Sequence, residues 1–216
     1  MDRRFEEARH RPPAWPDRGP RLYRDAQARR RHRGGPGWPL TGQHPDHGAY
    51  LVEFLPRPWP GPLGALFSDG TLRAIEALID EERGQPLPHA VLAHGDFDPT
   101  HIFCAGGGYS GLIDFGEIRG AEPAFDLGHF LLYDEASLLP ALLRGYGRVE
   151  PLPDGHGRSI IRSAVLLGLR QLCRCLGPPR HRPLDAPGVL ARARRLTALV
   201  GQSSAEPGGR MPSHGS

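Results

Sequence analysis

The chain contains no lysine, few cysteines and no long apolar run. All 27 of its basic residues are arginines, which we attribute to a GC-rich coding sequence rather than to a binding preference. Its three cysteines form neither a CxxC pair nor an even set, so a disulfide framework and a zinc site have little support. No apolar run approaches the roughly 20 residues of a membrane-spanning helix, and no apolar signal segment begins the chain. We therefore expect a cytoplasmic protein without a membrane partner.

The length and the glycine and proline content limit the size of the folded part. A chain of 216 residues is long enough for one domain with a real core and too short for two full ones. Its 29 glycines and 24 prolines make up about a quarter of the chain, close to the level at which low-complexity disorder is suspected. Part of the chain is therefore expected not to fold.

The positive charge is concentrated at the N-terminal end. Residues 1–47 hold 11 arginines and 6 acidic residues, a net charge of +5, whereas residues 48–216 hold 16 arginines and 18 acidic residues, a net charge of −2. A nucleic-acid-binding domain needs its basic excess on the folded part. Nucleic acid is therefore not an expected partner, although an arginine-rich arm within residues 1–47 that folds on RNA is an alternative.

Hydrophobic patterning divides the chain into three parts. Residues 1–47 show no sustained apolar period and are predicted to be a disordered leader rich in Arg, Pro and Gly. Residues 48–200 are predicted to fold, and residues 201–216 to form a disordered tail. Within the folded part, apolar side chains at helical spacing predict helices over 50–55, from Asp69 or Thr71 to Gly84, and over 127–132, 138–146, 160–176 and 189–200.

The segment between the second and third predicted helices has the pattern of β structure. A short apolar run at 90–93 precedes the polar turn HGDFDP, and two short apolar runs at 102–104 and 111–113 flank a glycine-rich turn. Two such runs joined by glycines predict a β-hairpin. The predicted fold class is therefore α+β, mainly helical, with a small hairpin.

Two carboxylates stand at the ends of these strands. Asp96 follows the first apolar run, and Asp114 follows the last strand of the hairpin, so the hairpin is expected to bring the two together. Phosphoryl transfer needs one carboxylate to accept the proton of the substrate hydroxyl and another to hold Mg²⁺ against the phosphate oxygens. Asp96 and Asp114 supply these two roles in outline.

Three motifs in this order resemble those of a known family. HGDFDPTHIF at 94–103, LIDFGE at 112–117 and EPAFDLG at 122–128 are similar to the HGD-x4-N, IDF and GDP-x2-DLA signatures of aminoglycoside phosphotransferases and their choline-kinase-like relatives. Three ordered motifs are far more specific than one. The resemblance implies a protein-kinase-like C-terminal lobe that uses ATP and Mg²⁺ to phosphorylate a small hydroxylated substrate, which we expect to be cationic.

The resemblance also implies roles for individual residues. Asp96 would be the catalytic base and Asp114 a Mg²⁺ ligand. Asp126 would brace the catalytic loop and His94 would orient it. Asp98 and Glu117 would lie on the substrate or metal side of the site.

Each carboxylate also has a structural alternative. Asp96 would then be a turn former before Pro99, and Asp114 a strand-end carboxylate bonded to its own backbone. Asp126 is as compatible with an ordinary helix N-cap as with a bracing residue, because Asp often precedes an apolar helical run.

The chain departs from the family pattern at three places. His101 replaces the asparagine that helps to bind metal, so that position is either a weakened metal ligand or a contact to phosphate or substrate. Glu122 replaces the aspartate of the GDP motif and keeps the carboxylate. No glycine-rich hairpin and no lysine precede the catalytic motif, although a kinase-like fold grips ATP with both.

These departures leave two hypotheses about function. In the first, the chain is a small-molecule phosphotransferase of which only the C-terminal lobe is present, through truncation or a mis-started reading frame. In the second, it is a degenerate, pseudokinase-like binding module that has kept the same fold without catalysis.

Overall fold

The computed structural model describes residues 47–55, 59, 61–85, 90–134 and 137–205. The predicted leader lies outside these residues except for His47, and so does the predicted tail from residue 206 onward. Among the described helices, none has the length and apolar character needed to cross a bilayer.

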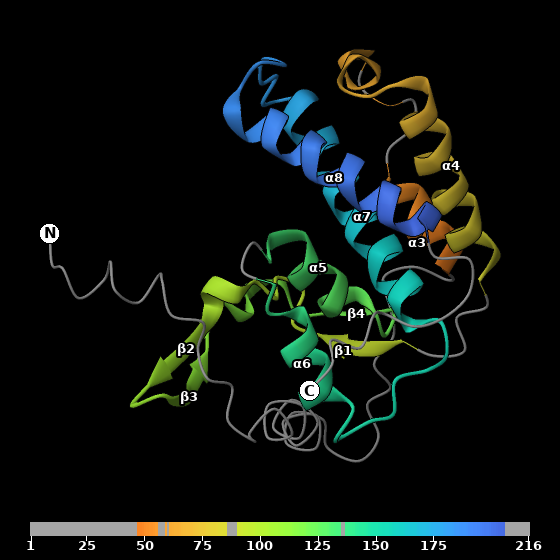
Figure 1. The fold of residues 1–216 in the computed structure, drawn as a ribbon. Helices are drawn as coiled ribbons and strands as arrows, with labels where there is room; N and C mark the ends of the chain where they lie inside the picture. The colour runs from red at the N-terminus through yellow and green to blue at the C-terminus, as the bar shows by residue number, and fades with distance from the viewer. Residues whose placement is uncertain (1–46, 56–58, 60, 86–89, 135–136, 206–216) are drawn as a thin grey trace, which may run out of the picture.

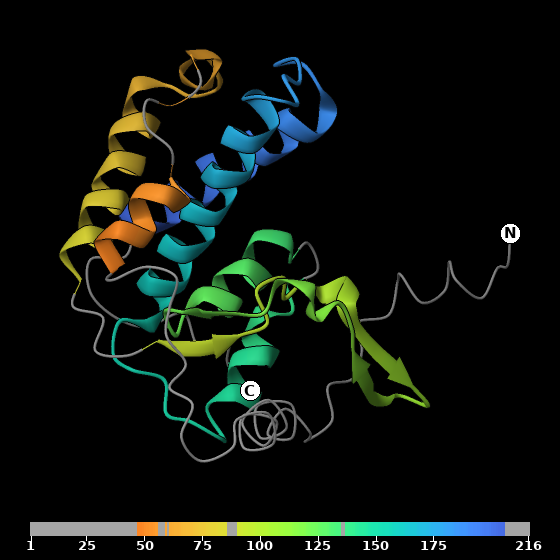
Figure 2. The same ribbon diagram turned by 180° about the vertical axis from the view of Figure 1, so that it is seen from behind.

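Four helices form one half of the described structure, the upper half in Figures 1 and 2. They are α3 (His47–Phe54), α4 (Asp69–Gly84), α7 (His156–Leu176) and α8 (Pro187–Ala205), with the 3₁₀ turn η1 (Gly61–Leu66) between α3 and α4. Helix α7 is buried over most of its length, since α4, α5 and α8 all pack against it. The predicted apolar stripe of this helix is confirmed.

Helix α4 begins and ends where the sequence predicts. Ser68 is the N-cap, and its hydroxyl accepts a hydrogen bond from the backbone N–H of Thr71 at 3.2 Å. Such a cap satisfies one of the free N–H groups at a helix start. The side chains of Ile75, Leu78 and Ile79 are buried toward the core, as the i, i+3, i+4 spacing predicts.

Two helices, α5 (Phe125–Tyr133) and α6 (Leu139–Tyr146), form the other half with the strands. The carboxylate of Asp134 accepts hydrogen bonds from the backbone N–H groups of Leu138, at 2.8 Å, and Leu139, at 2.7 Å. Helix α5 lies close against α7 because Gly128 has no side chain: a Cβ there would lie 2.6 Å from that of Ser163. This contact holds α5 close against α7.

The strands form two antiparallel pairs. Strands β2 (Ile102–Ala105) and β3 (Gly108–Leu112) make the predicted hairpin, which projects from the body of the molecule in Figures 1 and 2. Strand β1 (Val91–Ala93) pairs with β4 (Arg119–Ala121). The sequence did not predict β4, because Arg-Gly-Ala has neither the alternation nor the β-branched residues typical of a strand.

The pairing of β1 with β4 brings the two ends of the segment between them together. This segment contains the hairpin and two 3₁₀ turns, η2 (Pro99–His101) and η3 (Phe115–Glu117). The predicted α+β architecture, mainly helical with small antiparallel strands, is confirmed.

The end of the folded part differs from the prediction. Helix α8 continues to Ala205, so the predicted tail boundary at residue 201 is wrong. The reason is tertiary: the guanidinium of Arg158 on α7 donates to the carbonyl and hydroxyl oxygens of Ser203, at 3.2 and 3.3 Å. These bonds hold the last turns of α8 although the sequence there is polar.

Candidate active site

The loop that follows β1 carries the HGD motif and is held from below by α5. One carboxylate oxygen of Asp126 accepts the backbone N–H of His94 at 2.7 Å, and the other accepts that of Gly95 at 3.0 Å. The N-cap of α5 is Ala124, so Asp126 lies inside the first turn and does not act as the cap. Burial raises the pKa of Asp126, and the two N–H donors partly offset this effect.

His94 links the loop to the segment that carries Asp114. Its Nδ1 accepts the backbone N–H of Asp96 at 3.3 Å, and its Nε2 donates to the carbonyl oxygen of Ile113 at 2.9 Å. Both ring nitrogens of a neutral imidazole are thereby used. The imidazole holds the two candidate carboxylates in a fixed relation.

Gly95 lies against the turn η3 so closely that no other residue fits. Its φ angle is +88°, and a Cβ would lie 1.8 Å from the carbonyl oxygen of Glu117. Glycine adopts positive φ without the steric cost that other residues meet. The glycine of the HGD motif therefore sets the distance between the two halves of the site.

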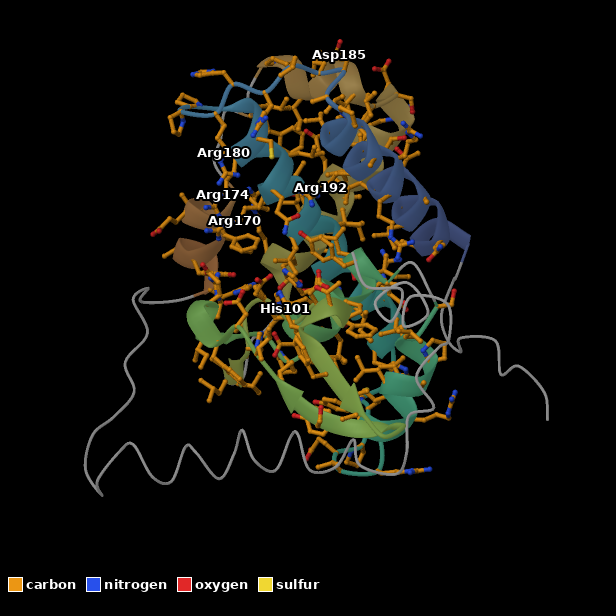
Figure 3. The ribbon with its side chains drawn as sticks, turned by 90° about the vertical axis from the view of Figure 1, so that its left-hand side faces the viewer. His101, Arg170, Arg174, Arg180, Asp185 and Arg192 are labelled. Carbon is orange, nitrogen blue, oxygen red and sulfur yellow. The ribbon has the colours of Figure 1, made fainter. Side chains whose placement is uncertain are left out.

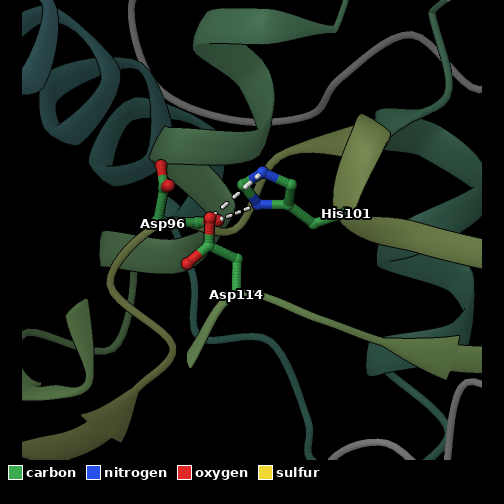
Figure 4. A group of neighbouring side chains, drawn as sticks. All are labelled: Asp96, His101 and Asp114. Atoms are coloured by element: carbon green, nitrogen blue, oxygen red, sulfur yellow. Dashed lines mark hydrogen bonds and ion pairs between the residues drawn. The ribbon is translucent and has the colours of Figure 1, made fainter. Parts of the chain in front are cut away.

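Three of the predicted site residues converge at this point, as Figure 4 shows. One carboxylate oxygen of Asp96, one of Asp114 and one ring nitrogen of His101 all lie within 4.8 Å of one another. Asp96 and His101 come from the loop after β1, and Asp114 comes from the end of β3. The hairpin between them makes this convergence possible.

The hydrogen bonding of His101 leaves one ring nitrogen for a ligand. Its Nδ1 lies 2.9 Å from the carbonyl oxygen of Asp96, which can only accept, so Nδ1 is the donor. In the neutral ring Nε2 then carries a lone pair, and it lies 3.9 Å from a carboxylate oxygen of Asp114. Two carboxylate oxygens and one imidazole nitrogen suit a divalent cation, which completes its coordination with water or phosphate oxygens.

Asp114 has a left-handed backbone conformation. Its φ and ψ angles are 64° and 56°, in the left-handed region that residues other than glycine seldom adopt. Its carboxylate makes no capping hydrogen bond to the turn η3 that it precedes. The structural alternative of a carboxylate bonded to its own backbone is therefore not realised among the described residues.

The sequence did not predict the role of His129, a buried residue of α5. Its Nε2 lies 3.1 Å from a carboxylate oxygen of Asp96. Burial lowers the pKa of His129, and the charge of the Asp96 carboxylate partly offsets this effect. His129 lies three residues after Asp126, so both side chains are on one face of α5. This spacing is the feature of the sequence from which the contact could have been predicted.

Asp98 and Glu117 have local partners. The carboxylate of Asp98 caps η2 and accepts from the N–H and the hydroxyl of Thr100, each at 2.7 Å. The turn-forming role considered for Asp96 therefore belongs to Asp98. Glu117 is exposed, and its carboxylate pairs with Arg119 at 2.5 Å. Neither belongs to the group of three residues that converge.

Glu122, where the family has aspartate, lies away from this group. It is partly buried between β4 and α5 and accepts a hydrogen bond from the hydroxyl of Ser163 at 2.9 Å. Burial, and to a lesser extent the charge of Glu82, raises the pKa of Glu122 to about 7. Its ordinary value in the unfolded chain is 4.5.

This raised pKa predicts how stability depends on pH. Between pH 4.5 and about 7 the folded chain holds a proton on Glu122 that the unfolded chain has lost, so stability falls as the pH rises and is level above that range. We expect Glu122→Gln to be more stable than the parent by about 2–3 kcal/mol at pH 8, with the difference vanishing toward pH 4.5. Urea unfolding across this range measures it.

The matched control for this prediction is Glu150→Gln, because Glu150 is exposed. It should show no such pH-dependent gain. A Glu122→Gln variant whose stability follows the parent at every pH would disprove the assignment.

A model of the phosphotransferase enzyme family matches residues 2–158, a range that includes all three motifs and begins within the segment 1–47. No curated protein matches the chain. A crystal structure of a thermostable mutant of aminoglycoside phosphotransferase APH(4)-Ia, in its apo form, is similar, with 16% sequence identity and a TM-score of 0.49. The alignment covers 76% of this chain and 55% of that chain, so this chain spans about half the length of that protein.

Proposed function

Because this chain belongs to the phosphotransferase enzyme family, we propose that it transfers a phosphoryl group from ATP to a hydroxyl of a small molecule. The observation that carries this proposal is the convergence of Asp96, His101 and Asp114 within 4.8 Å. A carboxylate beside a cation-binding pair is the arrangement that phosphoryl transfer to an alcohol requires.

In the proposed reaction Asp96 is the base. The oxygen of the substrate hydroxyl forms a bond to the γ-phosphorus of ATP while the bond from that phosphorus to the β-phosphate oxygen breaks. The hydroxyl proton passes to the carboxylate of Asp96, and ADP leaves with the electron pair of the broken bond. The chain's own contribution is to hold the carboxylate in place and to accept the proton.

Asp114 and His101 would hold the divalent cation. The donors are a carboxylate oxygen of Asp114 and Nε2 of His101, whose ring is oriented by the bond from Nδ1 to the carbonyl of Asp96. When bound, the cation neutralises the negative charge of the phosphate oxygens. A nitrogen ligand favours Mn²⁺ over Mg²⁺, because Mg²⁺ prefers oxygen ligands in a near-octahedral set.

His129 would be a positioning residue for the base. The buried imidazole would hold one carboxylate oxygen of Asp96 and leave the second to accept the proton, and the side chain of Asp96 is 36% exposed. A carboxylate with one oxygen fixed loses little freedom when the substrate binds.

Two exposed apolar side chains adjoin the cation-binding residues. Ile113, 48% exposed, precedes Asp114, and Phe103, 50% exposed, follows His101 by two residues. Apolar side chains beside a few polar groups are typical of small-molecule sites. We assign this surface to the base of the nucleotide.

The cysteines bear on the location of the protein. The free thiols of Cys104, Cys173 and Cys175 fit the reducing cytoplasm.

The test is phosphate transfer or release from ATP by the full chain with Mg²⁺ or Mn²⁺. Removal of a general base costs about 10²–10⁴-fold in rate, so Asp96→Asn should lose about 10³-fold. The control is Asp154→Asn, since Asp154 is an exposed carboxylate outside the site, and it should keep the parent rate. Equal rates in the parent and Asp96→Asn would favour the alternative of a non-catalytic binding module with the same fold.

A further inference from the structure

A pocket that has three arginines among its six lining residues lies where α5, α7 and α8 meet. Its volume is about 250 Å³, and its lining residues are Tyr133, Gln171, Arg174, Cys175, Arg180 and Arg192. Within the described part of the chain, no carboxylate lines it. Figure 3 shows its three arginines on the face of the molecule that also carries His101.

The walls of the pocket are held by hydrogen bonds that do not neutralise its charge. Tyr133 donates its hydroxyl to Gln171 at 2.9 Å, and a guanidinium nitrogen of Arg192 donates to the same hydroxyl at 3.2 Å. The loop that carries Arg180 is tied to α7 by the backbone N–H of Arg182, which donates to the carbonyl of Cys175 at 2.9 Å. These bonds fix the side chains of Tyr133, Gln171 and Arg192 and the backbone of the loop.

The arginines of the pocket have N–H donors that bind no other described residue. Over the described ranges, no side-chain hydrogen bond or ion pair joins Arg174 or Arg180 to another residue, and Arg192 uses one bond, to a neutral hydroxyl. Asp185, the acidic residue labelled with them in Figure 3, forms no ion pair with any of them. A guanidinium has five N–H donors in a fork that matches a phosphate or a carboxylate.

A further arginine adds to the positive charge. Arg170 lies one turn before Arg174 on α7, with its guanidinium 4.2 Å from the ring centroid of Phe54. Burial lowers the pKa of Arg170 most, and Tyr50 raises it. The charges of Arg119 and Arg174 lower it further. Arg170 and Arg174 therefore lie close enough on α7 for their charges to repel each other, and no ion pair joins either of them to an acidic residue among the described residues.

The helix dipole does not account for this arrangement. A positive charge is favourable in the last turn of a helix, which explains Arg174 at the end of α7. Arg180 lies outside any helix, and Arg192 lies in the N-terminal half of α8, where a positive charge gains nothing from the dipole.

The pocket is connected to the candidate base through one face of α5. The ring of Tyr133 packs against that of His129, with centroids 5.0 Å apart and a tilt of 31°, and His129 lies 3.1 Å from a carboxylate oxygen of Asp96. Four residues of helix correspond to a rise of about 6 Å. Tyr133, which lines the pocket, is therefore about one helical turn from the residue that contacts the candidate base.

We propose that this pocket binds the anionic group of the substrate, a phosphate monoester or a carboxylate. The inference rests on the proposed function for its link to catalysis, but the binding site itself does not need that function. It replaces the expectation of a cationic substrate: the two acidic residues assigned to the substrate side, Asp98 and Glu117, have local partners, whereas the arginines of the pocket have no anionic partner among the described residues.

The test is calorimetric binding of glycerol 3-phosphate, glycerate and uncharged glycerol to the full chain without nucleotide or metal. We expect one or both anions to bind and glycerol not to bind. Arg180→Gln and Arg192→Gln should each weaken anion binding by about tenfold, since a bond to a charged partner contributes about 1.5 kcal/mol or more. The matched control is Arg194→Gln, because Arg194 is an exposed residue of the same helix, and it should bind as the parent does.

Three results would overturn the proposal: no anion binding, equal binding of glycerol, or equal weakening by Arg194→Gln. Thermal unfolding of each variant shows whether it is folded. The chain could bind anions through these arginines and yet transfer no phosphate from ATP. That result would refute the proposed function and would still support the pocket as an anion-binding site.

Discussion

Replacing Arg162 with methionine should cost about 3–5 kcal/mol of stability, because it leaves a buried carboxylate without its main partner. Arg162 on α7 is 8% exposed and Glu82 on α4 is 3% exposed. The guanidinium Nε donates to Glu82, and Nη1 donates to Glu81 at 2.7 Å. Glu81 keeps Arg158 as a partner, whereas Glu82 keeps only His47 among the described side chains.

Urea unfolding followed by circular dichroism measures this loss, and two further variants make it specific. Arg83→Met removes an exposed pair with Asp80 on the same helix as Glu82 and should cost less than about 1 kcal/mol. The double variant Arg162→Met with Glu82→Leu removes the whole buried pair and should regain most of the loss. A double variant as unstable as the single one would contradict this account.

Gly95→Ala should dismantle the catalytic loop while the helical half stays folded. The new methyl group would lie 1.8 Å from a backbone oxygen of Glu117, which no side-chain rotation can relieve. The loop must therefore move away from η3, and the distance between Asp96 and Asp114 must change. We expect a loss of phosphate transfer of more than about 100-fold, since small displacements of reacting groups cost this much.

The matched control for this variant is Gly107→Ala. Gly107 also has a positive φ, +76°, but its added methyl group would meet no atom within 4 Å. It should cost only the backbone strain, about 1–2 kcal/mol of stability, with activity retained. Activity assays and far-ultraviolet circular dichroism on both variants compare them, and equal effects would show that the clash does not matter.

Local patterns in the sequence were sufficient to predict most of the elements. The glycine-rich turn and its flanking apolar runs predict the hairpin, and the stripe from Ile161 to Leu176 predicts the central helix. Strand β4 and the end of α8 were missed because tertiary partners create them: β4 exists through its pairing with β1, and the last turns of α8 through bonds from Arg158 to Ser203.

The part of the candidate site that lies in short sequence motifs could be predicted. The convergence of Asp96, His101 and Asp114 follows from a hairpin that returns the chain to its starting point. His129 was missed because its function depends on which face of α5 turns toward the loop. The arginine pocket was missed because its residues come from three separate elements of a chain in which every basic residue is arginine.

Binding of Mn²⁺ to the full chain, followed by electron paramagnetic resonance, tests most directly whether Asp114 and His101 hold a cation beside the base. We predict one bound ion in the parent and in Asp154→Asn. Asp114→Asn and His101→Ala should each bind at least tenfold more weakly, since even outer partners of a metal site contribute about 10–100-fold. Parent-like binding in both variants would contradict the account.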